Sequence, residues 1–333
     1  MYILYFAILA IVLIYLRKYF KGGRTTRTSM KGKVIVITGS SDGIGKECAF
    51  NLLEDGASVV FACRDEKKTN KVIEEVKNLR NGNECYKRSY FIHLDLSSFK
   101  SVDKFITEFK NKFDCIDILM NNAGYTATTY KETNDGLEAM SQTNHFSHVK
   151  LSLGLLDYFN KKEGRIINVS SMAHEFSNYE NTYKSHFSKA MGHDQYKDFF
   201  SVKNSWTVYG NTKLNNIYFT QYLTKLFNKD NKYSNMHAYC NHPGAVATGF
   251  LNVYSTDNIL LKVVVPIFRY ITLFFFKNVN DGAQTQLHLC YSNINNLKDG
   301  AYYSDCKLKK TADIARKEDI ENYIMQETLK IIK

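Results

Sequence analysis

The chain has 333 residues, of which 44% are hydrophobic, and this is enough to bury the core of at least one full domain. Two prolines and 18 glycines exclude a low-complexity or collagen-like chain. The seven cysteines are scattered and form no C-x-x-C pair, so the sequence predicts reduced thiols. The histidines show no paired metal-type spacing either, and we expect no metal site.

The net charge of +11 is concentrated near the start of the chain, where residues 1–33 contain no Asp or Glu. Basic residues that directly follow an apolar run bind anionic lipid headgroups and favour the cytosolic side of a membrane. No basic helix or aromatic platform accompanies the charge, so we expect no binding to nucleic acid. The seven basic residues are Arg17, Lys18, Lys21, Arg24, Arg27, Lys31 and Lys33.

Residues 2–16 form an uncharged, apolar run. As a helix at ~1.5 Å per residue the run reaches ~25 Å, which is at the short end for a bilayer core. A cleaved signal peptide would need a basic start and a small-residue cleavage site, and neither is present. We expect residues 1–20 to be an uncleaved anchor, spanning the bilayer or lying in one leaflet, that holds a cytosolic catalytic domain at the endoplasmic reticulum membrane. A buried helix of the globular core is the alternative.

Beyond the basic linker at residues 21–32, segments with strand and helix character alternate. Short, almost continuously apolar strands separated by helices predict a parallel sheet that is covered on both faces. We therefore expect an α/β fold, a Rossmann-type doubly wound parallel sheet in a single domain, over residues 33–306. Helices are predicted at Ile44–Leu53 and at residues 65–80. The predicted strands are Val34–Thr38, Ser58–Ala62, Phe91–Leu94, Ile116–Met120, Arg165–Val169 and Met236–Cys240.

Three further segments complete the predicted organisation. An insertion lies at about residues 175–204, and a lid or membrane-associated segment lies at about residues 255–277. The interior charges and proline of Ile259–Lys277 argue against a spanning helix and favour an interfacial helix or a lid over an apolar pocket. A core helix is the alternative there. Residues 307–333 carry mixed charges and predict a solvated, helical tail.

The run T-G-S-S-D-G-I-G, Thr38 to Gly45, follows the first predicted strand and opens the first predicted helix. Glycines allow a sharp turn and let a pyrophosphate approach amide groups at a helix N-terminus. The spacing G-x-x-x-G-x-G differs from the standard fingerprint, and glycine-rich turns also occur without a ligand. The candidate cofactor-binding residues of this turn are Gly39, Ser41, Gly43, Ile44 and Gly45.

The end of the second predicted strand, Ala62-Cys63-Arg64-Asp65, bears on the choice of cofactor. An NAD enzyme places an acid there to bind the ribose 2′-hydroxyl, whereas a 2′-phosphate needs a cation. Cys63 takes the position of the acid, and the planar guanidinium of Arg64 suits a phosphate. We therefore expect NADP(H), with a plain surface charge as the alternative role of Arg64. Asp65 is expected to start the next helix.

Tyr209 and Lys213 share one face of a predicted helix because they are four residues apart. A free tyrosine titrates near pH ~10, and a nearby ammonium brings that pKa toward neutrality, which suits acid–base catalysis. Upstream, the strand R-I-I-N-V ends in Ser170 and Ser171, at the sheet edge where ligands gather. A serine hydroxyl there is placed to stabilise charge on a substrate oxygen. Ser170 is expected only to cap the strand.

The sequence resembles the short-chain dehydrogenases/reductases, and within them the membrane-bound, NADP-linked retinol dehydrogenases. The resemblance extends from about Lys31 to Cys306. It is carried by T-G-S-S-D-G-I-G-K-E, A-C-R-D, L-D-L-S-S at Leu94–Ser98, N-N-A-G at Asn121–Gly124, N-V-S-S-M-A-H, Y-G-N-T-K-L, H-P-G at His242–Gly244, D-G-A-Q-T and Y-Y-S-D-C-K.

The resemblance implies roles for individual residues. Tyr209 would be the general acid/base, and Lys213 would lower its pKa and hold the nicotinamide ribose. Ser171 would bind the substrate oxygen, and Asn144 would support a water in the proton relay. Further cofactor contacts would come from Asp95 at the adenine, from Asn121, Ala123 and Gly124 on the adenosine side, and from Pro243, Gly244 and Thr248 over the nicotinamide.

The sequence departs from the usual pattern of the family at two places, one in the cofactor-binding turn and one on the substrate side. Ser41-Asp42 stands where Asn-Thr is more usual, and the long stretch between Ser171 and Tyr209 lies on the substrate side. The expected substrate is a lipophilic alcohol or carbonyl, retinol- or retinal-like, with a steroid or a long-chain lipid aldehyde or ketone as the alternative. Membrane lipids and a second copy in a homodimer are the other expected partners. A catalytically silent nucleotide-binding membrane scaffold is the rival class.

Overall fold

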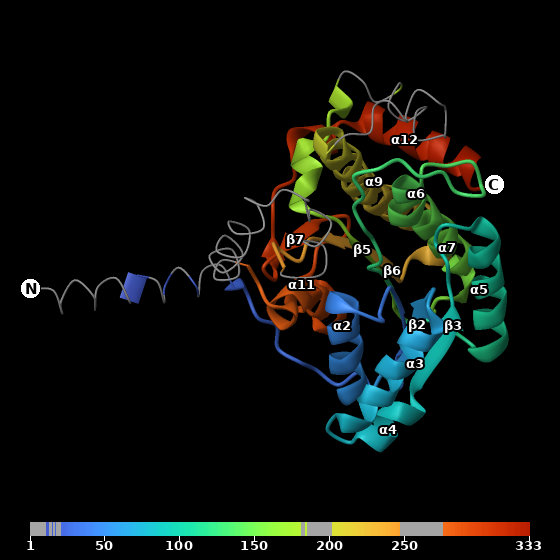
Figure 1. Cartoon of the computed structure of the whole chain (residues 1–333), viewed down its shortest axis with the longest axis vertical. Coiled ribbons are helices and arrows are strands. Elements are labelled where there is room, and N and C mark those ends of the chain that lie inside the picture. Colours follow the sequence, from blue (N-terminus) through green and yellow to red (C-terminus); the bar gives the residue numbers. More distant parts are fainter. Residues whose placement is uncertain are drawn as a thin grey trace, which may run out of the picture.

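The computed structural model describes residues 21–180, 202–246 and 276–333, together with Ile11, Val12, Tyr15, Arg17 and Lys184. Within these residues, strands form one sheet in the order β3-β2-β1-β4-β5-β6-β7-β8 (Figure 1). All neighbouring strands run parallel except β7 and β8. The strands are β1 (Val34–Thr38), β2 (Ser58–Cys63), β3 (Ser89–His93), β4 (Ile118–Asn121), β5 (Gly164–Val169), β6 (Met236–Asn241), β7 (Tyr302–Ser304) and β8 (Lys307–Leu308).

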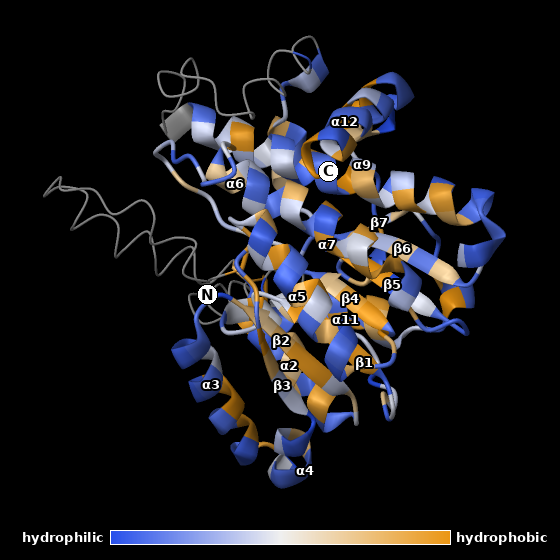
Figure 2. Ribbon diagram, turned by 90° about the vertical axis from the view of Figure 1, so that its right-hand side faces the viewer, coloured by the Kyte–Doolittle hydropathy of each residue, from blue (hydrophilic) through white to orange (hydrophobic). Residues whose placement is uncertain are grey.

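Helices cover both faces of the sheet, and each face has its own hydrophobic core. One core joins the sheet to α2, α3 and α11, and the other joins it to α5, α7, α9 and α12. Figure 2 shows apolar strands running between the two layers. The helices are α2 (Gly43–Glu54), α3 (Glu66–Glu75), α4 (Gly82–Lys87), α5 (Phe99–Lys112), α6 (Ala139–Ser141), α7 (Ser147–Leu155), α9 (Val202–Lys229), α11 (Val279–Tyr291) and α12 (Glu318–Ile331).

The predicted doubly wound parallel sheet in a single domain is confirmed. Each of the six predicted strands overlaps an observed one, with ends that differ by one or two residues. β7 and β8 were not predicted, because strands of three and two residues carry too little pattern to recognise. They extend the sheet beyond β6 and close it with the single antiparallel pair.

Several predicted features lie outside the described residues. Most of the predicted anchor (residues 1–20), most of the insertion and of the predicted lid, and Thr248 belong to this group. Among the residues that are described, no helix combines the length and the apolar character needed to cross a bilayer.

The basic linker packs on the domain through ion pairs. Arg24 Nη2 lies 2.9 Å from the buried carboxylate of Asp281 at the start of α11. Arg27 pairs with two carboxylates at the end of α2, and Lys33 Nζ lies 3.1 Å from Asp117. Three of the seven N-terminal basic residues are thus paired with carboxylates of the domain. Their partners lie far away in the sequence, so composition alone could not reveal them.

The C-terminal tail is also docked, and the expectation of a solvated helix is wrong. α12 packs against α9, and both views of the molecule show the two helices side by side (Figures 1 and 2). Most of the mixed charges occupy the outer face of α12, with Glu321 as the buried exception, while its apolar residues repeat at helical spacing on the inner face. The buried residues of α12 are Ile320, Glu321, Ile324, Met325 and Thr328.

Arg165 on β5 ties the sheet to the end of α11. Its side chain is 6% exposed, and Nη1 donates to the carbonyl groups of Leu289, Cys290 and Ser292 at 2.8, 3.0 and 2.8 Å. The last carbonyls of a helix have no partner within the helix, and the guanidinium supplies donors for them. Arg165 therefore caps α11 from within the sheet.

We predict that Arg165→Leu lowers the free energy of unfolding by about 2–4 kcal/mol, because it removes the donors from buried carbonyls. Denaturant unfolding followed by circular dichroism measures the loss. Arg316→Leu is the control, since it breaks only exposed contacts, an ion pair with Asp313 and a hydrogen bond to the Thr311 carbonyl, and should change stability by about 0.5 kcal/mol or less. Equal losses in the two variants would contradict the capping role of Arg165.

Candidate active site

The predicted site residues that the structure describes, all of them except Thr248, gather at one edge of the sheet. Because β1, β4, β5 and β6 run parallel, their carboxyl ends lie at the same edge (Figure 1). Gly39 follows β1, Asn121 ends β4, Ser171 follows β5, and Pro243 follows β6. Ligands of open α/β sheets bind at this edge, where the strand order reverses. Here that reversal falls between β1 and β4.

The turn between β1 and α2 leaves no room for side chains at two of its glycines. Gly39 has φ +66°, and a Cβ there would lie 3.0 Å from the Cβ of Ala123. A Cβ on Gly45 would lie 2.5 Å from Nδ2 of Asn122. The turn therefore presents backbone amides at the start of α2, and these amides fit the pyrophosphate of a dinucleotide.

Asp42 adds a carboxylate to this turn, but its charge is compensated. It is the N-cap of α2, accepts a hydrogen bond from the Gly43 amide at 2.7 Å, and lies 2.6 Å from Nζ of Lys68. The Lys68 ammonium lowers the pKa of Asp42, so the ion pair persists at neutral pH. Ser41 beside it is partly buried. The unusual Ser41-Asp42 pair is thus a helix cap held by a cation.

The end of β2 offers a cation and no free carboxylate. Cys63 is 4% exposed, with Sγ 3.5 Å from Oγ of Ser40, and Arg64 is exposed. Asp65 is the N-cap of α3 and accepts from the Lys68 amide at 2.9 Å, which confirms its predicted place at a helix start. The arrangement leaves Arg64 available to a 2′-phosphate.

Two polar residues brace this edge near the ends of β3 and β4. Asp95, in the loop after β3, accepts from the amide and the hydroxyl of Ser97 at 2.9 and 2.7 Å. Asn121 is 1% exposed, and its Nδ2 donates to Asn168 at 2.8 Å and to Ser152 at 2.9 Å. Asn121 therefore links β4 to β5 and α7 from inside the core.

Tyr209 and Lys213 lie one turn apart on α9, as their spacing predicts. Nζ of Lys213 lies 5.4 Å from the centre of the Tyr209 ring and donates to the carbonyl of Val169 at 3.2 Å. Lys213 is 3% exposed, and burial lowers its pKa to about 8. A cation is thus held close to the phenol in surroundings that exclude water, where its electrostatic effect is large.

Asn144 and Gly124 border the same cation. A Cβ on Gly124 would lie 3.1 Å from Nζ of Lys213 and 3.3 Å from Oδ1 of Asn144. The Asn144 amide exchanges two hydrogen bonds with the backbone of Tyr125, at 3.0 and 2.9 Å. Asn144 lies in a π-helical turn, Gln142–Phe146, and such turns are frequent at functional sites.

Ser171 reaches the site from the end of β5. Its Oγ accepts from the Ala173 amide at 3.1 Å, and the short helix Met172–Phe176 that follows packs on α9. The packing is tight beside Tyr209, since a Cβ on Gly210 would lie 2.5 Å from the Ala173 carbonyl. Ser170, by contrast, is 1% exposed and donates to the Lys213 carbonyl at 2.7 Å. Ser170 therefore anchors α9 to β5.

The loop after β6 is stabilised by an ion pair between a buried lysine and a half-exposed aspartate, which sequence reasoning missed. Gly244 has φ +89°, and its amide donates to Nδ1 of His242 at 3.0 Å. Lys277 is 5% exposed; its Cε would lie 2.9 Å from a Cβ on Gly244, and its Nζ lies 2.5 Å from Asp305. The Asp in the motif Y-Y-S-D-C-K was the only available sign of this pair. Pro243 in the same loop is partly buried.

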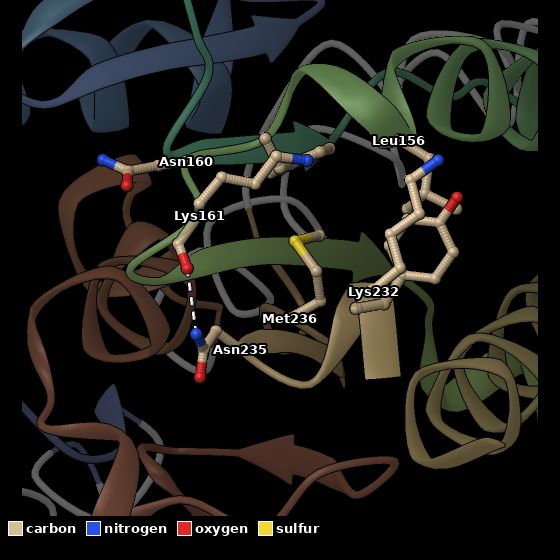
Figure 3. Close-up of a pocket in the computed structure, with 8 residues that line it drawn as sticks. Leu156, Asn160, Lys161, Lys232, Asn235 and Met236 are labelled. Atoms are coloured by element: carbon tan, nitrogen blue, oxygen red, sulfur yellow. Dashed lines mark hydrogen bonds between the residues drawn. The ribbon is translucent and has the colours of Figure 1, made fainter. Parts of the chain in front are cut away.

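A small surface hollow lies elsewhere, at the opposite edge of the sheet. Met236, which begins β6, lines it together with Asn160 and Lys232 (Figure 3). Asn235 donates to the Lys161 carbonyl at its rim at 2.9 Å. Since the amino ends of the strands meet there, this hollow is separate from the candidate active site.

Fold and site together define an oxidoreductase of the dinucleotide-binding α/β class. The sequence model of the family described as "short chain dehydrogenase" matches residues 33–190. The chain is 34% identical to retinol dehydrogenase 12 of Mus musculus over 90% of this chain and 87% of that protein. The chain therefore belongs to the short-chain dehydrogenase family, whose members oxidise CH–OH groups or reduce the corresponding carbonyls.

A further relative supports the same family, and a solved structure shares the fold. Retinol dehydrogenase 11 of Homo sapiens is 33% identical over 92% of this chain and 87% of that protein. A short-chain dehydrogenase of Shigella flexneri, solved in complex with NADP, has a TM-score of 0.60 at 18% identity and covers 85% of this chain and 100% of its own. The resemblance to the family that the sequence motifs suggested is thus confirmed.

The burial of Lys213 leads to a prediction about the stability of the fold. Its pKa is about 8 in the fold against an ordinary value of 10.5, so the folded state binds the proton less tightly than the unfolded chain. The charged lysine therefore destabilises the fold fully below pH 8, and the effect fades as the pH rises toward 10.5. We predict that Lys213→Met raises the free energy of unfolding by about 1–3 kcal/mol at pH 7.

Urea unfolding of both proteins at pH 7 and at pH 10 measures this difference. The stabilisation should be smaller at pH 10. Lys229→Met is the control, because Lys229 lies exposed at the end of the same helix and its loss should change stability by about 0.5 kcal/mol or less. A Lys213→Met protein that is less stable than the wild type at pH 7 would show that burial does not disfavour this cation.

Proposed function

We propose that this protein is an NADP(H)-dependent oxidoreductase that transfers a hydride between the nicotinamide and a lipophilic alcohol or carbonyl, with retinol or retinal as the type of substrate. One observation carries the proposal: a buried lysine ammonium lies 5.4 Å from the ring of Tyr209, on a helix packed against the turn that holds Ser171. This arrangement suits a phenol that exchanges a proton with a substrate oxygen.

The chemistry divides between the cofactor and the side chains. When bound, the nicotinamide supplies the hydride acceptor or donor. The Lys213 ammonium stabilises the phenolate form of Tyr209. The Tyr209 hydroxyl gives its proton to the substrate oxygen during reduction, and the Tyr209 phenolate takes a proton from the substrate hydroxyl during oxidation. The Ser171 hydroxyl donates a hydrogen bond to the same oxygen and stabilises its developing charge. Asn144 holds the loop that faces Lys213.

NADP(H) is the proposed cofactor because the end of β2 carries a cation. Cys63 replaces the acid that would bind a 2′-hydroxyl, and Arg64 is exposed beside it. The fold neighbour from Shigella flexneri was solved with NADP, which agrees with this choice. The proposed cofactor contacts are Gly39, Ser41, Gly43, Ile44, Gly45, Arg64, Asp95, Asn121, Ala123, Gly124, Tyr209, Lys213, Pro243, Gly244 and Thr248.

The lipophilic substrate follows from similarity and from sequence. Retinol dehydrogenases of mouse and human are about a third identical to this chain. The apolar stretch Ile259–Lys277 is proposed as an interfacial or lid segment, and residues 1–20 as a membrane anchor. A steroid or a long-chain aldehyde or ketone would use the same chemistry. Attachment to the endoplasmic reticulum membrane and a homodimer belong to the same proposal.

An assay of purified full-length protein in detergent tests the function. NADPH oxidation is followed at 340 nm with all-trans-retinal, a steroid ketone and a long-chain aldehyde as separate substrates. Saturable turnover of one of them supports the proposal and identifies the substrate class. Saturable NADPH binding without turnover of any of them would instead favour a nucleotide-binding scaffold.

We predict that Tyr209→Phe lowers kcat by about 10³-fold or more, because the general acid/base is lost. NADPH affinity, measured by quenching of protein fluorescence, should change little. Tyr222→Phe is the matched control, since Tyr222 lies partly buried on the same helix and packs on the core. Turnover that survives in Tyr209→Phe would rule out this mechanism.

We predict that Arg64→Asp changes the cofactor preference from NADPH toward NADH. The new carboxylate repels a 2′-phosphate and accepts a hydrogen bond from a 2′-hydroxyl, and loss of one charge-assisted phosphate contact weakens NADPH binding by about 10- to 100-fold. The ratio of kcat/KM for the two cofactors measures the change. Arg80→Asp introduces the same charge at an exposed position on another loop and should leave the ratio unchanged. An unaltered ratio in Arg64→Asp would remove Arg64 from the site.

A further inference from the structure

Asn216, one turn beyond Lys213 on α9, joins two elements of the site. It is 3% exposed, and its Nδ2 donates to the backbone carbonyls of Asn144 and Val169, each at 3.1 Å. Two carbonyl oxygens can only accept, so the nitrogen of the amide must face them and Oδ1 must face away. Asn216 thus holds the π-helical turn of Asn144 against the end of β5.

His145 continues this chain of hydrogen bonds toward the C-terminus. It is 1% exposed; its Nδ1 lies 3.2 Å from Oδ1 of Asn216, and its Nε2 lies 3.1 Å from Oγ1 of Thr328 on α12. Because Oδ1 of Asn216 is an acceptor, Nδ1 carries the hydrogen and Nε2 accepts from the Thr328 hydroxyl. Burial lowers the pKa of His145 to about 4, so the ring stays neutral and keeps its acceptor at neutral pH.

This series of hydrogen bonds ends at the ammonium group of Lys213. The Val169 carbonyl accepts from Asn216 and also from Nζ of Lys213, at 3.1 and 3.2 Å. The Val169 carbonyl oxygen thus accepts a hydrogen bond from the Lys213 ammonium. The position of the Val169 carbonyl therefore governs where the Lys213 ammonium lies relative to the Tyr209 ring. The series of hydrogen bonds that begins at Thr328 supports that carbonyl.

A second link joins the C-terminal segment to Ser171. His174 is fully buried, its Nε2 accepts from the Ala312 amide at 3.1 Å, and its Nδ1 lies 2.8 Å from the Ser171 carbonyl. An amide nitrogen can only donate, so Nδ1 carries the hydrogen and donates to Ser171. Burial also lowers the pKa of His174, which favours this neutral form. Both histidines are thus neutral, with the hydrogen on Nδ1 and with Nε2 as the acceptor toward the C-terminal segment.

We propose that the C-terminal segment, residues 309–332, is a working part of the active site, which positions Lys213 and Ser171 through the buried histidines His145 and His174. The proposal rests on the oxidoreductase function proposed above. His145 directly follows Asn144, and His174 lies three residues after Ser171. The Nε2 atom of each histidine accepts a hydrogen bond from the C-terminal segment. Thr328, His145 and Asn216 are positioning residues, because they act on the reaction through Lys213.

Thr328→Val tests the longer chain with little change of volume. It removes the hydroxyl that donates to His145, and we expect kcat to fall by about tenfold while KM for NADPH and the NADPH dissociation constant stay unchanged, since a small displacement near the reacting groups has this size of effect. Thr328→Ser restores the hydroxyl and should return kcat to within about twofold of the wild type. Thr224→Val is the control, because the Thr224 hydroxyl donates only within α9, to the Thr220 carbonyl.

Nitrogen NMR of ¹⁵N-histidine-labelled protein gives a readout that does not depend on turnover. The Nε2 signal of His145, assigned by its absence in His145→Gln, should shift in Thr328→Val and return in Thr328→Ser. An unchanged signal, or an unchanged kcat beside an active wild type, would overturn the inference and leave the oxidoreductase function standing. A wild type that turns over no carbonyl would overturn the proposed function itself and, with it, the catalytic part of this inference.

Discussion

Keeping a lysine cation inside the protein next to a tyrosine is the constraint around which this site is organised. The Lys213 side chain is withdrawn from water, and burial lowers its pKa to about 8, so the folded chain tolerates the charge only at some loss of stability. The helix that carries Lys213, α9, is held to β5 by the hydrogen bond from the Ser170 hydroxyl to the Lys213 carbonyl. The ammonium of Lys213 is held by its hydrogen bond to the Val169 carbonyl. Gly124 leaves the space in front of the ammonium open.

The parallel sheet brings the remaining groups to that cation. Parallel strands place all their carboxyl ends at one edge, so the residues that directly follow β1, β4, β5 and β6 meet there although they are far apart in the sequence. The turn at Gly39 supplies backbone amides for an anion, and the turn at Ser171 supplies a hydroxyl. One edge thus brings together the groups that we propose to bind a phosphate and to move a proton.

The two ends of the described chain are tied to opposite layers of this domain. The linker that follows the N-terminal apolar run packs on α2 and α11 through the ion pairs of Arg24 and Arg27. The C-terminal helix α12 packs on α9, the helix that carries the tyrosine and the lysine. Segments that look like polar appendages in the sequence therefore belong to the packed structure, and the C-terminal one is hydrogen-bonded to the buried histidines His145 and His174 beside the candidate site.

By itself, the sequence determined the features that depend on neighbours in the chain. Runs of apolar residues indicated six strands, the glycine spacing indicated the turn before α2, and the four-residue spacing of Tyr209 and Lys213 put both on one helix face. Only the tertiary structure decided the contacts between distant segments, such as Arg24 with Asp281, 257 residues apart, and His145 with Thr328, 183 residues apart. The physical reason is that periodicity and capping act within a few residues, whereas the partner of a buried polar group is chosen by the packing of whole helices and strands.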